Sequence, residues 1–178
     1  MANTDAPRGF SCTGTQYGLE PVSVDADGGT AIFRGDVLAG EADGNAIPAG
    51  ATVVTKIGIA HGAVEVSTAQ KALSAASTAG TILISQDPMQ QYIVQSAGTD
   101  VGEQLHIFAA CDHVAGAGST VTGLSGHELD LSGPSASNGG FVLLDYVLRD
   151  DNDETAKNVD CVVRMNVGEG ILSLNAGV

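Results

Sequence analysis

The 178-residue sequence contains no tryptophan, and aromatic residues make up only 4% of it. Basic residues are also scarce, because 7 Lys and Arg residues stand against 21 Asp and Glu residues, for a formal net charge of −14. Contact with nucleic-acid phosphates or with an anionic membrane depends on a basic surface. We therefore expect neither a nucleic-acid partner nor a membrane partner. The acidic surplus indicates a soluble, self-repelling surface.

Cysteine is rare as well, with Cys12, Cys111 and Cys161 as the complete set. An odd number of cysteines does not make a disulfide framework, so we expect reduced thiols. The first residues carry no basic or apolar signal region, and no apolar run approaches the roughly 18 residues of a membrane span. We therefore expect a protein that is made in the cytoplasm and not exported.

Residues 1–30 are rich in Gly, Thr, Asp and Pro and have no sustained periodicity. Phe10, Tyr17 and Leu19 are isolated apolar residues within them. The pattern predicts an extended N-terminal arm over residues 1–30 that gains order against a partner. Residues 31–178 are then a single β-rich domain, which is a suitable length for one hydrophobic core.

Alternating apolar residues predict strands in most of that domain. Residues 53–59 and 64–66 alternate and predict a hairpin closed near His61-Gly62, and residues 82–84 and 92–94 are short apolar strands. The Ala-rich stretch 69–79 is the best helix candidate. With seven to nine strands and little helix, the chain is expected to be all-β, with an antiparallel barrel or sandwich body.

We expect the C-terminal third of the chain to form the centre of the hydrophobic core. Residues 141–148 (FVLLDYVL) are almost continuously apolar, which is typical of a strand covered on both faces. Residues 161–167 alternate, so the two segments predict a long hairpin around an acidic loop. The expected core residues of this hairpin are Phe141, Leu143, Leu144, Val147 and Leu148, with Val163 and Met165 opposite.

Three motifs suggest chemistry, and each departs from the pattern that the chemistry needs. His106, Cys111 and His113 are good zinc ligands, but their spacing is not a standard metal signature. The acidic run 150–154 offers oxygen ligands for Ca²⁺ but lacks the glycine and glutamate positions of an EF-hand. Ordinary strand-end residues and a solvated hairpin loop are the expected roles.

Ser125 and His127 lie in the run TGLSGH, which resembles a nucleophile elbow. His127 replaces the second glycine of that motif, and no helix pattern follows. Phosphate-binding loops are absent, and no segment assembles a nucleophile, a base and an oxyanion site. We therefore expect a protein that is not an enzyme and that has no cofactor and no metal.

Six segments in one order carry a resemblance to a known family. They are MANTDAPRGF (1–10), AIFRGDVL (31–38), KIGIAHG (56–62), DPMQQYIVQSAG (87–98), TGLSGHELD (122–130) and LRDDN (148–152). Together they resemble the cement, decoration or minor capsid proteins of tailed-bacteriophage heads, whose segments include M-A-N-x-x-A-P-x-G-F and T-G-x-S-G-x-E-L-D. The order and approximate spacing hold over nearly the whole chain, although Asp150 stands where the family often has proline.

The resemblance implies a structural protein that binds the outer surface of a phage head and stabilises the shell at junctions between capsid subunits. Its implied partners are the major capsid protein and further copies of itself, as a dimer or trimer. The implied location is the capsid surface of the virion, after assembly in the host cytoplasm. On the predicted arm, the candidate capsid contacts are Ala6, Pro7, Gly9, Phe10, Tyr17 and Leu19.

Two other functions stay open at this point. One is a virion-surface binding module for a host glycan or receptor, although sugar sites usually use exposed aromatic residues and this chain has few. The other is a metal-dependent hydrolase built on the His and Cys residues described above.

Overall fold

The computed structural model describes residues 3–16, 18–24, 29–51, 56–63, 72–98, 100–135 and 139–166. These residues form eleven β-strands and one short 3-10 helix, η1 (Gln104–His106). The strands form two antiparallel sheets, so the predicted all-β class with little helix is confirmed. The body is sandwich-like and forms no closed barrel within the described residues, although an isolated bridge between Ser96 and Leu129 connects the end of β7 with β9.

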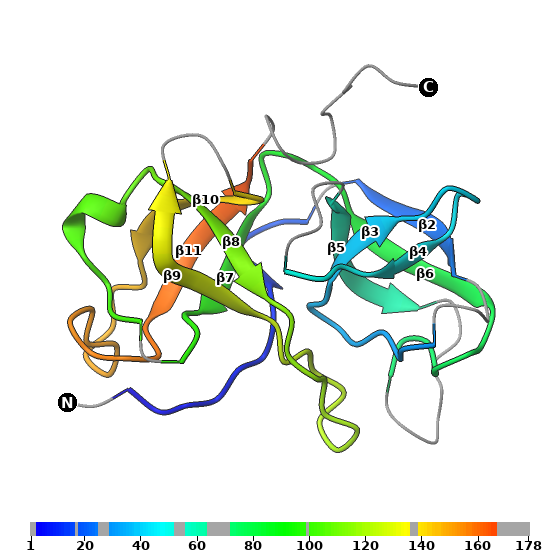
Figure 1. Ribbon diagram of the computed structural model, residues 1–178, viewed down its shortest axis with the longest axis horizontal. Coiled ribbons are helices and arrows are strands. Elements are labelled where there is room, and N and C mark those ends of the chain that lie inside the picture. Colours follow the sequence, from blue (N-terminus) through cyan, green and yellow to red (C-terminus); the bar gives the residue numbers. More distant parts are fainter. Residues whose placement is uncertain are drawn as a thin grey trace.

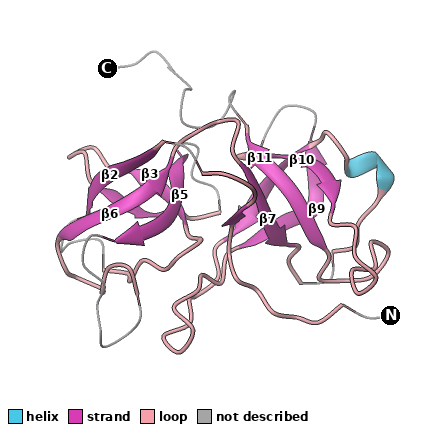
Figure 2. Cartoon of the chain, turned by 180° about the vertical axis from the view of Figure 1, so that it is seen from behind, coloured by secondary structure: helices cyan, strands magenta, loops and turns pink. Residues whose placement is uncertain are grey.

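The two sheets occupy opposite halves of the molecule (Figures 1 and 2). The six-stranded sheet has the order β1 (Ser11–Cys12), β7 (Gln91–Gln95), β11 (Asp160–Met165), β10 (Phe141–Tyr146), β8 (Ala110–Val114) and β9 (Glu128–Ser135). The five-stranded sheet has the order β2 (Leu19–Val24), β6 (Gly80–Ser85), β5 (Lys56–Ala63), β3 (Val37–Gly40) and β4 (Ala46–Pro48). No helix of the described residues has the length and apolar character needed to cross a bilayer.

The N-terminal segment contributes an edge strand to each sheet. Strand β1 pairs with β7, and β2 pairs with β6 along all of its six residues. The segment is extended, as predicted, but the prediction of an arm that waits for a partner is wrong for its described residues. The physical reason is that strands β1 and β2 find their hydrogen-bond partners in β7 and β6 of the same chain.

The larger hydrophobic cluster joins the two sheets. It contains Tyr92 and Phe141 from the six-stranded sheet and Val37 and Ile59 from the five-stranded sheet. Phe10 lies among them, with its ring stacked on that of Phe141 at 4.3 Å between centroids and edge-on to Tyr92 at 6.5 Å. Such ring pairs add stability beyond the area that they bury. The N-terminal segment is therefore part of the core.

Two polar contacts also connect the sheets. The hydroxyl of Tyr92 in β7 donates to the hydroxyl oxygen of Ser85 in β6 at 2.9 Å, and both residues are buried. The ammonium group of Lys56 in β5 lies 3.0 Å from a carboxylate oxygen of Asp112 in β8. The Lys56 side chain is only 3% exposed, so loss of Asp112 would leave a buried cation without this partner.

Several local predictions are confirmed, and two are wrong. Strands β6, β7 and β11 and the β10–β11 hairpin occur where the apolar runs and the alternation in 161–167 predicted them. The turn predicted near His61-Gly62 is wrong, because β5 continues through both residues with a register shift opposite Leu83. The helix predicted over 69–79 is wrong for residues 72–79, which form turns and a bridge to Ile32, while 69–71 lie outside the described residues.

The core prediction for 141–148 is correct only in part. Phe141, Leu143, Val163 and Met165 are buried as expected. Strand β10 ends at Tyr146, and its side chains alternate between the core and the other face, so it is not covered on both faces. Leu144 and Val147 are half-buried, and Leu148 is 89% exposed because it follows the end of the strand.

Edge strand β2 carries two residues that disfavour further strand pairing. Glu20 is exposed and charged, and Pro21 has no backbone N–H to donate. The other edge of the same sheet is β4, which is only three residues long.

The position of Phe10 predicts a large loss of stability on truncation. Phe10→Ala should lower the free energy of unfolding by about 3–5 kcal/mol, because it leaves a cavity between the sheets. Urea unfolding of the purified protein measures the loss. Phe108→Ala is the matched control, since Phe108 is 78% exposed, and it should change stability by less than about 0.5 kcal/mol. Equal effects of the two substitutions would contradict the placement of Phe10.

Candidate functional site

The N-terminal segment, residues 3–10, lies on the body where several distant segments meet. Asn3 begins the contact, because its side-chain amide donates to the carbonyl oxygens of Asp153 and Lys157, each at 2.9 Å. Its side-chain oxygen accepts from the backbone N–H of Asp153 at 2.8 Å. A single side chain therefore holds the segment against the loop between β10 and β11.

Gln95 in β7 binds the middle of the segment. Its side-chain oxygen accepts from the backbone N–H of Ala6, and its amide donates to the carbonyl of Thr4, both at 2.9 Å. Arg8 lies 2.6 Å from the carboxylate of Asp160, which Arg149 also contacts at 2.8 Å. The Asp160 side chain is only 4% exposed, whereas those of Arg8 and Arg149 are 37% and 43% exposed, so a buried carboxylate is bound by two arginines at the surface.

The segment ends in a close contact between two glycines and a serine. The backbone N–H of Phe10 donates to the carbonyl of Gly35 at 2.9 Å. Gly9 has φ +69°, and a Cβ at this position would collide with the Ser125 side chain and with the Gly35 carbonyl oxygen. Ser125 in turn donates its backbone N–H to Arg34 at 2.9 Å. Only a residue without a side chain fits at Gly9.

These contacts bring together the segments that carry the sequence resemblance. The meeting segments are 3–10, 31–38, 87–98, 122–130 and 148–152, together with residues that directly follow the last of them. Each motif is weak alone, and the structure shows that they are neighbours in space. The shared pattern thus describes one packing unit.

The candidate capsid contacts differ in their exposure to solvent. Ala6 and Pro7 are exposed on the surface of the N-terminal segment, and Leu19 is half-buried in β2. Gly9 and Phe10 are buried, so the prediction that they face a partner is wrong, because they pack against the chain's own core. Tyr17 lies outside the described residues.

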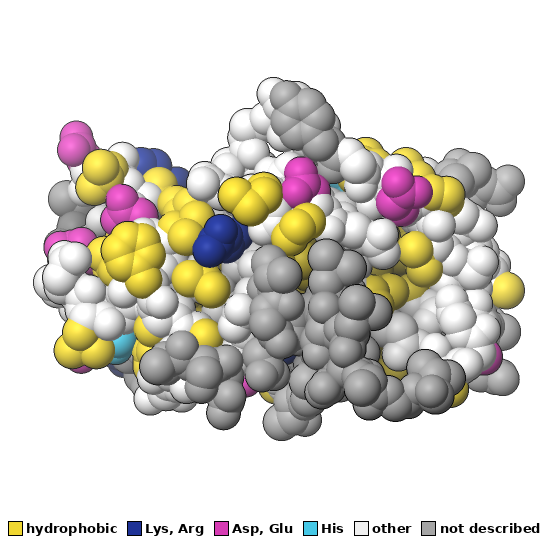
Figure 3. Space-filling view, turned by 90° about the horizontal axis from the view of Figure 1, so that it is seen from above, with side chains coloured by type: hydrophobic (Ala, Val, Ile, Leu, Met, Phe, Trp, Pro, Cys, Tyr) yellow, Lys and Arg dark blue, Asp and Glu magenta, His cyan; other side chains and the backbone are white. Residues whose placement is uncertain are grey.

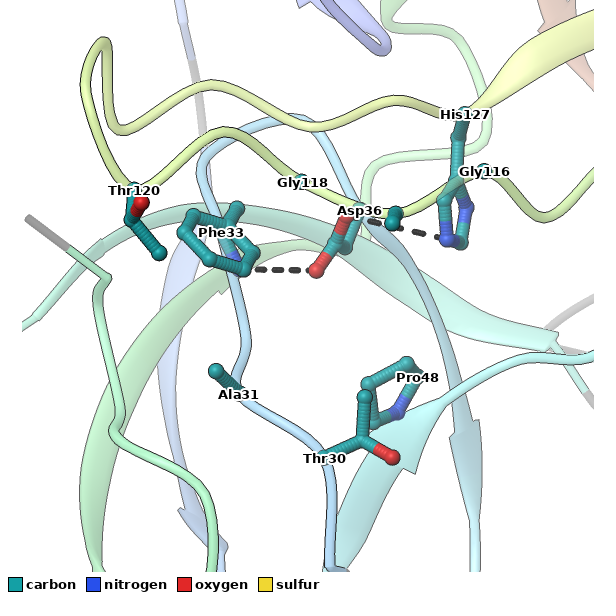
Figure 4. Close-up of a pocket in the computed structure, with 10 residues that line it drawn as sticks. Thr30, Ala31, Phe33, Asp36, Pro48, Gly116, Gly118, Thr120 and His127 are labelled. Atoms are coloured by element: carbon teal, nitrogen blue, oxygen red, sulfur yellow. Dashed lines mark hydrogen bonds and ion pairs between the residues drawn. The ribbon is translucent and has the colours of Figure 1, made fainter. Parts of the chain in front are cut away.

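Beneath this segment lies a buried polar cluster of Asp36, Ser125, His127 and His113 (Figure 4 shows Asp36 and His127). A carboxylate oxygen of Asp36 accepts from the backbone N–H of Phe33 at 2.7 Å. Nδ1 of His127 accepts from the backbone N–H of Val37 at 3.2 Å, and its Nε2 lies 3.6 Å from Asp36. The sequence indicated Ser125 and His127 but could not place Asp36 beside them.

The two histidines of the cluster stack on each other, with ring centroids 5.2 Å apart. Burial lowers the pKa of His127 to about 3, and His113 beside it lowers it too. Burial also lowers the pKa of His113 to about 4, and its Nε2 donates to the carbonyl of Ala49 at 3.1 Å. Both imidazoles are therefore neutral near pH 7, and the contact between His127 and Asp36 is not an ion pair.

A cavity of about 260 Å³ lies next to the cluster. Asp36 and His127 line it together with largely apolar neighbours, and Figure 4 shows Phe33 and Pro48 on its walls. Burial raises the pKa of Asp36 to about 6, against the lowering effect of its hydrogen bonds from Phe33 and Ser125. His127 directly precedes β9 and binds the backbone of Val37 at the start of β3, and Asp36 lies beside it. These contacts therefore connect β3 with β9.

The Ser125–His127 pair lacks the geometry of a nucleophile and its base. The Ser125 hydroxyl oxygen accepts from the backbone N–H of His127 at 2.9 Å. The ring nitrogens of His127 face Val37 and Asp36 instead. A serine is activated when its hydroxyl donates to the imidazole, whereas here the hydroxyl bonds to Asp36 and to the backbone of its own loop.

The residues weighed as candidate metal ligands are not brought together. Among the described ranges, no group of three or more His, Cys, Asp or Glu residues is placed to hold a metal ion. In the acidic run 150–154, Asp151 accepts from Arg149 at 2.9 Å, and Asn152 donates to Val147 at 2.8 Å. The three cysteines are unpaired, as predicted, and burial raises the pKa of the Cys111 thiol to about 12.

Comparisons with protein-family models, with curated proteins and with solved structures found no match for this chain. The arguments about function that follow therefore rest on the residues, their geometry and the sequence resemblance.

The Gly9 contact predicts a packing defect in a substituted protein. Gly9→Ala should destabilise more than Gly14→Ala, because both glycines have positive φ but only Gly9 is crowded. The shared backbone strain costs about 1–2 kcal/mol, and the collision at Gly9 adds about 1–3 kcal/mol. Thermal or urea unfolding of the two variants measures the difference. Equal stability of the two variants would contradict the close contact with Ser125.

The buried histidines predict lower stability in acid. The unfolded chain protonates histidine near its ordinary pKa of 6.5, whereas the folded pKa values are about 4 and about 3. The unfolded state therefore binds more protons as the pH falls from 6.5 towards 4, and stability decreases. Asp36 acts oppositely, because its folded pKa of about 6 lies above its ordinary 3.8.

Urea unfolding at a series of pH values separates these effects. His127→Asn should flatten the dependence of stability on pH between 6.5 and 4, with each titrating histidine contributing up to about 1.4 kcal/mol per pH unit. Asp36→Asn should make the dependence steeper, since it removes the opposing group. A slope that neither substitution changes would show that these groups do not titrate differently on folding.

Proposed function

We propose that this protein is a structural cement or decoration protein that binds the outside of a tailed-phage head and stabilises its shell at subunit junctions. The observation that carries the proposal is the convergence of the resembling segments. Segments 31–38, 87–98 and 122–130 meet segment 3–10 around Gly9 and Phe10, and segment 148–152 meets it further along, where Arg149 shares Asp160 with Arg8. The pattern therefore follows one structural unit.

The architecture supports a structural role. The N-terminal segment, both sheets and the β10–β11 loop are joined by buried rings and hydrogen bonds, which gives a body suited to bearing load. Many copies of such a body, each binding weakly, would together resist expansion of a shell. The net charge of −14 supports a role outside the shell, because an acidic protein has no attraction for packaged nucleic acid.

The proposal includes a non-enzymatic role and self-association on the shell. What supports the first part is that Ser125 is 1% exposed and that His127, at 3%, uses its ring for contacts within the chain. The second part rests on the resemblance.

The composition of purified virions tests the proposal. Mass spectrometry of virions of the phage that encodes the chain should find it in a fixed, high ratio to the major capsid protein. Electron cryomicroscopy should show density for it at repeating positions outside the shell, and that density should be absent when its gene is deleted. Absence from virions, or a few copies on the tail, would overturn the proposal, and a few copies that bind glycans would favour a receptor-binding module.

A further inference from the structure

One end of the molecule exposes large apolar side chains on two neighbouring loops. We define this end face as residues 102–109 and 147–158. Three of the most exposed large apolar residues of the described chain belong to it, namely Leu105 (74% exposed), Phe108 (78%) and Leu148 (89%). Figures 1 and 2 place η1 and the loop after β10 at the same end, away from the five-stranded sheet.

The two loops of the end face contact each other. The backbone N–H of Glu103 donates to the hydroxyl oxygen of Tyr146, and that hydroxyl donates to the Glu103 carbonyl, both at 2.9 Å. Gly102 lies against the carbonyl oxygen of Glu154, which is 2.6 Å from where a Cβ would be. The two segments that carry the exposed apolar residues are therefore direct neighbours at this end of the molecule.

Phe108 is held in place by its backbone. Its N–H donates to the carbonyl of Leu143 in the buried part of β10 at 2.7 Å, and Leu143 donates to Ala109 at 3.1 Å. Its φ is +69°, a left-handed conformation that is uncommon for a bulky side chain. Packing does not explain a phenylalanine at this position, because its ring is exposed to solvent. The turn does not explain it either, because glycine would adopt the left-handed conformation with less strain.

The end face is also acidic. Glu103, Asp150, Asp151 and Glu154 are exposed on it, with Arg149 and Lys157 as its basic residues. Asp151 is paired with Arg149. In the space-filling view, apolar and acidic side chains lie side by side on the half of the molecule that holds the six-stranded sheet (Figure 3).

We propose that the end face is the surface that docks on the phage shell, with Phe108 and Leu105 entering an apolar depression on a capsid subunit that is rimmed by basic residues. This inference rests on the proposed function and moves the principal contact away from the N-terminal segment. A side chain on a backbone that is already fixed loses less entropy on binding, as for Phe108. A basic rim complements the surrounding carboxylates.

The charge of the end face selects this partner over a second copy of the chain. Two such faces placed together would bring like charges into a contact with low dielectric, which is unfavourable. A capsid subunit with basic residues around an apolar depression has no such penalty.

The test is co-sedimentation of the purified full chain with heads of the encoding phage made without its gene. Phe108→Gly is the central variant, because glycine accepts the left-handed backbone while the ring is removed. We expect the melting temperature to stay equal to or rise above that of the unsubstituted protein, while binding to heads weakens at least tenfold. Leu105→Ser should weaken binding as well.

Matched controls use residues outside the end face. Val121→Ser removes another apolar side chain that is 75% exposed, and it should leave binding unchanged. Glu103→Lys should weaken binding, whereas Glu20→Lys on exposed β2 should not.

The outcomes separate the two proposals. If the unsubstituted protein binds heads and Phe108→Gly binds equally well, the end face is not the docking surface, although the proposed function stands. If the unsubstituted protein fails to bind, both proposals are overturned. If Phe108→Gly converts an oligomer in solution to a monomer, the end face is a contact between copies, and the capsid partner is overturned.

Discussion

The insertion of Phe10 between the two sheets is the interaction on which the rest of the structure depends. Its ring contacts Phe141 and Tyr92, and its backbone is bonded to Gly35. The sheets share no strand, so their relation is set by side chains in the space between them. A ring supplied by the start of the chain fills part of this space. The N-terminal segment, which has little apolar character of its own, is thereby required for the core.

The same insertion orders the polar contacts around it. Because Phe10 is buried, Gly9 must approach Ser125, and residues 3–8 must follow the surface past Gln95 to the β10–β11 loop. Burial of Asp36, His113 and His127 below this path gives a neutral polar cluster whose groups are satisfied mainly by backbone. The loop that carries Phe108 is bonded to the same sheet, through backbone hydrogen bonds with Leu143 of β10.

Local sequence patterns predict those elements whose stability is local in origin. The alternation in 161–167 predicted β11, because a period of two reports directly on one buried face. The short apolar runs at 82–84 and 92–94 predicted β6 and β7, because a run of that length bounded by turn residues is typical of a buried strand. The turn predicted at His61-Gly62 was wrong because these residues form an irregularity within β5, where the register shifts. In a sequence, a glycine at such an irregularity looks the same as a glycine in a turn. Phe10 had no periodic neighbours, so its burial was not visible. The Ser125–His127 pair was found by its motif, but Asp36 and His113 join it from distant strands, and spacing along the chain carries no information on such contacts.

Strand β2 has a consequence for how copies of this protein can gather. Many molecules crowded on one surface bring open sheet edges within reach of each other, and unpaired edges join readily into extended sheets and fibres. Pro21 interrupts the row of donors on this edge, and Glu20 adds charge beside it. This edge is therefore a poor site for joining the sheets of neighbouring copies, wherever copies of the chain come close together.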